Sequence, residues 1–154
     1  MSIYDNLSRV KEGIAAACAA AGRPEQDVTL VAVSKTFAPA AINEAIAAGA
    51  TDVGENYVQE FVQKREEIDD RARLHFIGHL QSNKAKLVVG KVSLIQSVDR
   101  LSLAQELNRL AEKSGLRQRV LLEVNVGGEA SKSGAPFEAV DELAHQIALL
   151  PGLE

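Results

Sequence analysis

The sequence predicts an α/β protein built on a parallel sheet, and two observations support this fold class. Short apolar segments rich in β-branched residues alternate with amphipathic helical segments along the 154 residues. The apolar segments recur about every 23 residues and begin near residues 29, 51, 74, 93 and 119. Strict alternation of strands and helices makes the strands parallel, with helices covering the sheet. A (β/α)₈ barrel and an open doubly wound sheet both have this pattern.

The first predicted element is a helix that ends near Gly22, because glycine and the nearby Pro24 stop helices. Its apolar face consists of Ile3, Leu7, Val10, Ile14 and Ala17. Cys18 lies beside this stripe, and we expect a buried, unreactive thiol there.

Two strand–helix units come next. Residues 29–35 (TLVAVSK) form a nearly continuous apolar run, as expected for a strand buried on both faces. Pro39 suits the first turn of the helix that follows, and Gly49 ends that helix. Residues 51–56 are predicted to form the second strand, and residues 58–68 the helix after it.

Three further strands are predicted at residues 74–80, 93–99 and 119–126. A short helix is expected at 82–89, and Asp99 is expected to cap the next helix. The apolar face of that next helix carries Leu103, Leu107, Leu110 and Ala111. Pro136 is predicted to open the last helix, and a sixth strand begins at residues 152–154.

The spacing of these units favours the barrel over the doubly wound sheet. A doubly wound sheet that binds nucleotides carries a glycine-rich loop after its first strand, and Ser34-Lys35-Thr36-Phe37 is not such a loop. Neither G-x-G-x-x-G nor a Walker motif occurs in the sequence.

The composition excludes several classes of protein. With 46% hydrophobic and 25% charged residues, the chain is neither disordered nor collagen-like. A net charge of −4 and 4% aromatic residues give no basis for general nucleic-acid binding. The single cysteine excludes an intramolecular disulfide and indicates a reducing, cytoplasmic compartment. No apolar run is long enough to span a membrane, and we expect no membrane partner.

Polar residues at the carboxyl ends of the strands are the candidates for function in both architectures. They are Lys35, Glu55, Asn56, His79, Gln81, Ser97, Asp99, Glu123 and Asn125. Lys35 directly ends an apolar run, so we expect it to be partly desolvated, which would make a neutral amine available to attack aldehydes. The alternative is a lysine that extends from the strand end into solvent.

The other candidates have weaker signals. Asn56 and Asn125 could bind a ligand or simply form turns. His75 and His79 would share one face of a strand, but no third metal ligand accompanies them, and no metal is predicted. Lys132 lies in a polar loop that could order around an anion.

Four segments together resemble the pyridoxal phosphate homeostasis protein family. They are VAVSKTFAPAAINEAIAAGATDVGENYVQE, LHFIGHLQSNKAK, IQSVDRLSLAQELN and EVNVGGEASKSG. The resemblance implies the (β/α)₈ barrel of the alanine racemase N-terminal domain, with pyridoxal 5′-phosphate as cofactor. In this family the lysine that matches Lys35 forms an internal aldimine with the cofactor.

The resemblance also assigns the other cofactor-binding residues. The GENY motif contributes Asn56, and the segments after the third and fourth strands contribute His79, Gln81 and Ser97. Most members carry proline where this chain has His79. Lys132 matches a lysine linked to the transfer or secondary binding of B6 vitamers. No catalytic residue is assigned.

The function that the resemblance implies is pyridoxal phosphate binding for vitamin B6 homeostasis, without strong catalysis. An alternative is an amino-acid racemase-like enzyme, although no second domain and no second base are evident. Another is a scaffold or oligomerisation unit that binds no B6 vitamer.

The 154 residues correspond to five βα units of a single barrel domain, whereas eight such units need roughly 200 residues or more. In the family, the last strands carry the phosphate-binding groups. We therefore expect weaker cofactor binding than in full-length relatives. Those relatives are expected to be monomers, whereas exposed sheet edges would favour self-association of this chain.

Overall fold

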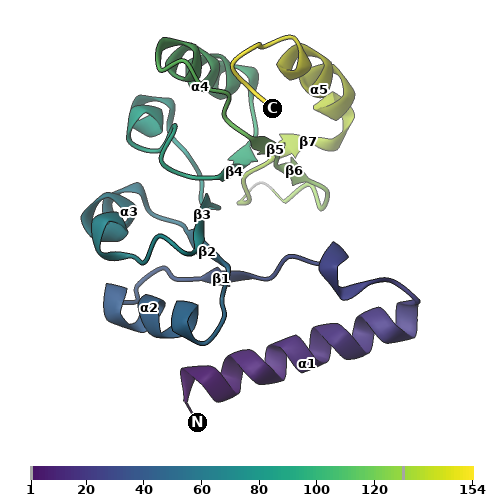
Figure 1. Ribbon diagram of the computed structural model, residues 1–154. Coiled ribbons are helices and arrows are strands. Elements are labelled where there is room, and N and C mark those ends of the chain that lie inside the picture. The colour runs from purple at the N-terminus through teal and green to yellow at the C-terminus, as the bar shows by residue number, and fades with distance from the viewer. Residues whose placement is uncertain (1, 130) are drawn as a thin grey trace.

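A five-stranded parallel sheet lies at the centre of the computed structural model, which describes residues 2–129 and 131–154 (Figure 1). Its strands are β1 (Val31–Val33), β2 (Asp52–Glu55), β3 (Arg73–Phe76), β4 (Leu94–Val98) and β5 (Val120–Leu122). Their order in the sheet is the order along the chain. A doubly wound sheet reverses its order at a switch point, so this sheet has the barrel arrangement.

Helices cover one face of the sheet. They are α2 (Pro39–Ala47), α3 (Val58–Lys64) and α4 (Leu101–Lys113), which follow one another beside the strands (Figure 1). α5 (Val140–Ala148) packs against α4. Short 3₁₀ segments occupy residues 25–27, 65–67, 82–87 and 137–139.

The hydrophobic core shows which side of each strand faces these helices. Val53 packs with Ile42 and Ile46 of α2, and Phe76 lies in one cluster with Phe61 of α3. Since side chains alternate along a strand, the neighbours of Val53 and Phe76 point the other way. We call this second side the inner face, and it carries Asp52, Gly54, His75 and Gln96.

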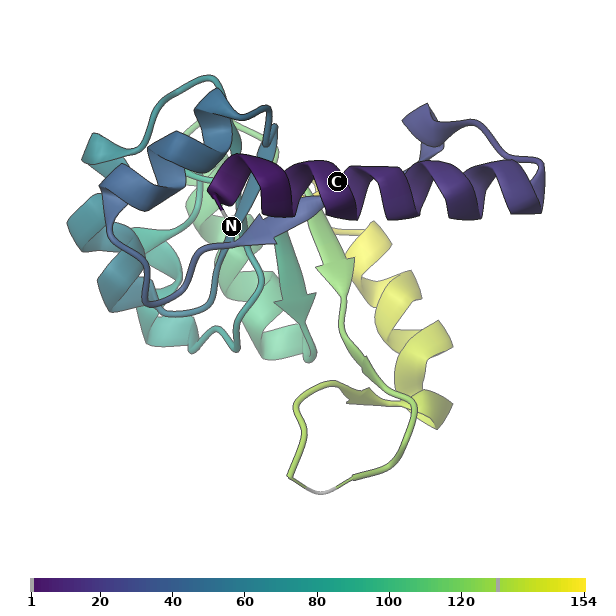
Figure 2. The same cartoon turned by 90° about the horizontal axis from the view of Figure 1, so that it is seen from below.

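α1 (Ile3–Ala21) runs past α2 and projects beyond the sheet (Figure 2). The Ser2 hydroxyl accepts a hydrogen bond from the Asp5 amide, and the Asp5 carboxylate accepts one from the Ser2 amide. Gly22 ends the helix in a left-handed conformation at φ 63°, as predicted. Cys18 is buried as expected, but Val10 of the predicted apolar face is 46% exposed.

The structure shortens several predicted elements. The predicted strand at 74–80 ends at Phe76, because the next residues turn towards the 3₁₀ segment at 82–87. That segment replaces the predicted short helix, and it is held by bonds such as Lys84 N to Gln81 O, 2.9 Å. Asp99 does not cap α4: Arg100 occupies the cap position, and the Asp99 carboxylate pairs with Arg100 and His79 instead.

The predicted strand at 119–126 divides at Glu123. Beyond β5, β6 (Val124–Asn125) pairs with β7 (Ala135–Pro136) and closes a polar loop. Pro136 therefore lies in a strand, and a 3₁₀ turn separates it from α5. The predicted sixth strand is present as a parallel bridge between Leu153 and Gln118. Within the described ranges, no helix is both long and apolar enough to cross a membrane.

Candidate functional site

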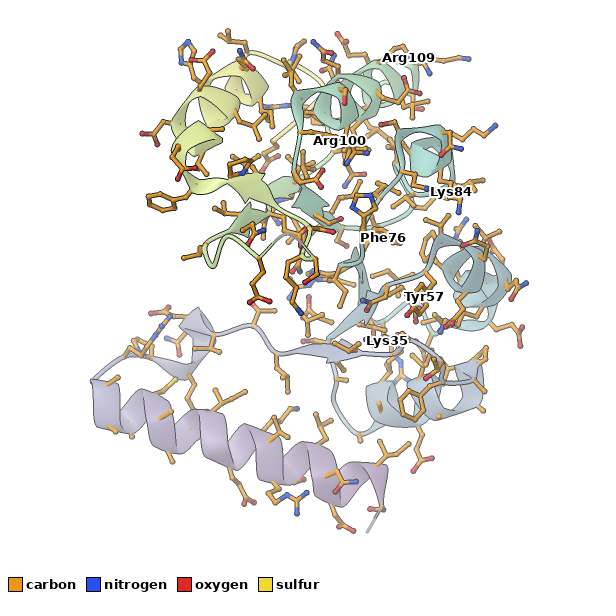
Figure 3. The ribbon with its side chains drawn as sticks, turned by 180° about the vertical axis from the view of Figure 1, so that it is seen from behind. Lys35, Tyr57, Phe76, Lys84, Arg100 and Arg109 are labelled. Atoms are coloured by element: carbon orange, nitrogen blue, oxygen red, sulfur yellow. The ribbon has the colours of Figure 1, made fainter. Side chains whose placement is uncertain are left out.

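The register of the first two strands brings Lys35 and Asn56 together at the carboxyl ends of the strands, which we call this edge of the sheet. Val33 lies opposite Gly54, and the ladder continues with a bond from Ser34 N to Gly54 O, 2.9 Å. Two residues further along each strand are Lys35 and Asn56. Figure 3 shows Lys35 after β1 and Tyr57 after β2, at neighbouring strand ends.

Lys35 is exposed, so the structure has the alternative of a lysine that extends into solvent, and the expectation of a partly desolvated amine is wrong. β1 is only three residues long, and within the described residues it pairs with β2 alone. Val33, two residues before Lys35, is itself 49% exposed. The apolar run therefore does not bury the lysine that ends it.

Unpartnered polar atoms gather at this edge of the sheet. Among the described residues, four buried side-chain atoms lack a hydrogen-bond partner: Glu55 Oε2, Asn56 Oδ1, Ser97 Oγ and Glu123 Oε2. Glu55 ends β2 and Asn56 follows it, Ser97 is the last residue but one of β4, and Glu123 follows β5. Because buried polar groups in native proteins are normally paired, these unpaired atoms are candidates for binding a polar ligand.

Ser97 and Glu123 occupy the far part of this edge. Ser97 is 1% exposed and lies where the pairing of β4 with β5 shifts register, between Ile95 and Val98. Burial raises the pKa of the Glu123 carboxyl, repulsion from Asp99 raises it further, and His79 opposes them. Glu123 was one of the strand-end candidates in the sequence, and its position near the end of the predicted strand at 119–126 was not enough to single it out.

His79 connects the sheet to the polar loop between β6 and β7. Its Nδ1 atom lies 3.4 Å from Ser133 Oγ and 3.6 Å from Asp99 Oδ2. Lys132 lies in that loop and is exposed, and Asn125 holds the loop through bonds from its Nδ2 to Glu129 O, 2.9 Å, and Lys132 O, 3.5 Å. Asn125 therefore has the turn role that the sequence left open.

Gln81 is also exposed, and its backbone carbonyl starts the 3₁₀ segment. The structure thus brings Lys35, Asn56 and Ser97 to one edge of the sheet. It places His79 beside the loop that carries Lys132, while Gln81 lies at the surface.

A second polar cluster, on the inner face, involves His75 and is separate from His79. His75 Nε2 lies 2.8 Å from Asp52 Oδ1, and His75 Nδ1 lies 2.9 Å from Gln96 Nε2. Arg73 donates two hydrogen bonds of 2.8 Å to the Asp52 carboxylate. Both ring nitrogens of His75 are therefore engaged. No group of metal-ligating side chains occurs among residues 2–129 and 131–154.

Comparisons with known proteins agree with this fold. Residues 6–154 match the family model described as alanine racemase, N-terminal domain. The pyridoxal phosphate homeostasis protein of Aquifex aeolicus is 45% identical over 155 residues, which cover 100% of this chain and 68% of that protein.

Two solved structures are also similar over 99% of this chain. A structure described as an unknown protein from Bifidobacterium adolescentis has a TM-score of 0.93 and 39% identity, and the match covers 66% of it. PipY of Synechococcus elongatus PCC7942, solved with PLP bound, has a TM-score of 0.82 and 32% identity, with 67% covered. The chain therefore spans about two thirds of the length of these proteins.

Proposed function

The chain belongs to the pyridoxal phosphate homeostasis protein family, and on this premise we propose that it binds pyridoxal 5′-phosphate covalently through Lys35. The names of its relatives and the PLP-bound structure of PipY support this cofactor. The observation in this chain that carries the proposal is the shared edge: one accessible amine and several unpartnered polar atoms lie together at the strand ends.

The residues at this edge fit the chemical groups of the cofactor. Bound pyridoxal phosphate supplies an aldehyde carbon and an electron-withdrawing pyridine ring. Lys35 would hold the cofactor through its amine, to which bound pyridoxal phosphate would supply the aldehyde carbon for an imine, with the aldehyde oxygen released as water. Asn56 and Ser97 offer hydrogen bonds to the polar substituents of the ring, and the exposure of Lys35 gives the cofactor access.

We assign lesser roles to the remaining candidates. His79 and Gln81 follow β3 on its carboxyl side, and Lys132 offers a second attachment point for B6 vitamers from the loop. The physiological role we propose is a cytoplasmic carrier or buffer of the cofactor, in a single barrel domain, rather than a strong catalyst. The free, buried thiol of Cys18 is consistent with a reducing compartment.

The test is to add pyridoxal phosphate to the 154-residue chain and record the visible absorbance band of the imine. Borohydride should fix the cofactor, and peptide mass spectrometry should find it on Lys35. Lys35→Ala should abolish the band, whereas Lys91→Ala, which removes another exposed lysine, should retain it. A band of wild-type strength in Lys35→Ala would show that the assignment is wrong.

The same samples test the non-catalytic role. D- and L-alanine are added to the loaded chain, and we expect no interconversion above that of free pyridoxal phosphate. Turnover that disappears in Lys35→Ala would instead identify a racemase-like enzyme.

A further inference from the structure

We propose that Glu60 and Lys64 of α3, on the helix-covered face of the sheet, hold the turn after β1 and thereby position Lys35. We call this pair the clamp. Neither residue belongs to the set of cofactor-binding residues, and neither is placed on the inner face. The clamp rests on the proposed function in one respect only, which is the role of Lys35. We treat both as positioning residues, because their contacts are to the turn that carries the lysine.

Lys64 holds the turn from both sides of Lys35. Its side chain is 8% exposed, and Nζ donates to Ser34 O at 2.9 Å and to Phe37 O at 3.3 Å. Nζ also pairs with the buried Glu55 carboxylate at 2.8 Å. A buried ammonium needs such partners, and two of the partners here are the backbone carbonyls just before and two residues after Lys35.

Glu60 holds the residue that follows Lys35. Its Oε2 accepts a hydrogen bond from Thr36 N at 2.8 Å and lies 3.2 Å from Lys64 Nζ. The Thr36 amide is the main reason why the pKa of Glu60 lies below its ordinary value. Glu60 Oε2 therefore connects the Thr36 amide to the Lys64 ammonium, which itself binds the carbonyls on either side of Lys35.

Thr36 needs this support because of its conformation. Its φ is 69°, in the left-handed region, and among the described residues it is the only non-glycine residue with a positive φ. That region is unfavourable for a β-branched side chain, since Cβ and the carbonyl oxygen crowd each other. Without the hydrogen bond to Glu60, Thr36 would return to negative φ and turn the preceding peptide. The direction of the Lys35 side chain towards the Asn56 edge would then be lost.

The first experiment measures the clamp without any cofactor. Amide hydrogen exchange at Thr36 is compared in wild type, Glu60→Ala and Glu66→Ala. Glu66 is a nearby carboxylate, 76% exposed and paired with Arg65, so its loss controls for charge. Removal of a hydrogen bond to a charged acceptor should speed exchange about tenfold in Glu60→Ala. Glu66→Ala should match wild type.

The second experiment measures positioning. The rate of borohydride-fixable adduct formation at Lys35 should fall about tenfold in Glu60→Ala and stay at the wild-type value in Glu66→Ala. Glu60→Gln keeps an oxygen acceptor for Thr36 and should recover most of the rate. Thr36→Asn, placed in the Glu60→Ala background, should also recover rate, because asparagine tolerates positive φ better than threonine. A role confined to overall stability would give no such rescue.

Lys64 is tested by a conservative change. Lys64→Met leaves Glu55 buried without its cation and is expected to unfold the region. Lys64→Arg keeps the charge and should fold, but its planar donors cannot match the ammonium geometry. Its adduct rate should therefore lie between those of wild type and Glu60→Ala.

The outcomes separate the two proposals. If the wild-type chain forms no adduct at Lys35, the proposed function fails, and the positioning role fails with it. If wild type forms the adduct and Glu60→Ala forms it at the same rate, the positioning role alone is overturned. Faster Thr36 exchange with an unchanged adduct rate overturns it as well.

Discussion

The two ends of the sheet treat buried polar groups in opposite ways. Towards the amino ends, the Asp52 carboxylate is bound by Arg73, His75 and Thr51, and Gln96 occupies the remaining nitrogen of His75. At the carboxyl ends, four buried oxygens have no partner. A fully paired network fixes the register of the strands, whereas unpaired groups retain hydrogen-bonding capacity for a ligand.

The electrostatics follow the same division. Burial raises the pKa of Asp52, but hydrogen bonds from Arg73, Thr51 and His75 outweigh burial and lower this pKa to about 2. For Glu123 at the other end, burial and the Asp99 charge raise the pKa. The amino end thus stabilises the negative charge of Asp52, whereas the surroundings of Glu123 at the carboxyl end disfavour a negative charge. The comparison predicts that substitutions at the first end change stability and those at the second change binding.

Asp52→Asn should have the largest effect on stability. It leaves Arg73 without its carboxylate and disturbs the hydrogen bond to the buried His75. Arg73 is solvent-exposed, so the cost is that of the lost hydrogen bonds to a buried charged acceptor, about 2 kcal/mol of unfolding free energy. Urea denaturation measures this loss, and pyridoxal phosphate binding by the folded fraction should be retained. A loss of unfolding free energy below about 0.5 kcal/mol would contradict a structural role for the amino end.

Acid should remove part of the same stability. The pKa of Asp52 is about 2 in the folded chain and 3.8 in its ordinary state. A lowered pKa stabilises the fold above pH 5, and this contribution, about 2 kcal/mol, is lost as the pH falls towards 2. Denaturation of wild type and Asp52→Asn across this range checks the sign. The difference between the two proteins should shrink with acid, and a constant difference would contradict the assignment.

Gly78→Ala tests the close packing of the chain at the carboxyl end of the sheet. A Cβ atom at Gly78 would lie 2.0 Å from Asn56 O, so β2 and the segment after β3 would have to separate. Overpacking of this kind costs about 1–2 kcal/mol. It should also displace Asn56 and weaken cofactor binding, which absorbance titration would show. A control is Gly13→Ala, where the added methyl group meets no atom within 4 Å.

Ser97→Ala should have the smallest effect on stability. The hydroxyl is buried without a partner, so its removal should change unfolding free energy by less than about 0.5 kcal/mol. Binding of pyridoxal phosphate should nevertheless weaken severalfold. A large loss of stability, with binding unchanged, would mean that Ser97 belongs to the structural end.

Much of the fold was predictable from the sequence, because hydrophobic periodicity and turn residues act locally. The strand order, the helix that Gly22 ends and the bridge at Leu153 agree with the predictions. The site was predictable in part, since any polar residue at a strand end was a candidate. For Lys35 the sequence left a desolvated and an exposed lysine as alternatives, because its exposure depends on which strands flank β1 rather than on the run of residues before it.

Contacts between distant segments explain what the sequence concealed. Lys64 lies in the helix predicted at 58–68, and no pattern in the sequence singles it out, yet it is buried against Ser34 and Glu55. Asp99 looked like a helix cap, yet it meets His79 across the sheet edge. Both outcomes depend on residues about 20 to 30 positions away, which no local pattern contains.

The construction of α1 gives the molecule a built-in reporter of local opening. The helix is capped at both ends by its own neighbouring residues, and Cys18 is its buried residue. Such a helix can detach while the sheet stays folded, since detachment sacrifices little core packing. The Cys18 thiol would then become accessible to an alkylating reagent. The rate of its alkylation under native conditions would measure how often α1 separates from α2, with no cysteine introduced by mutation.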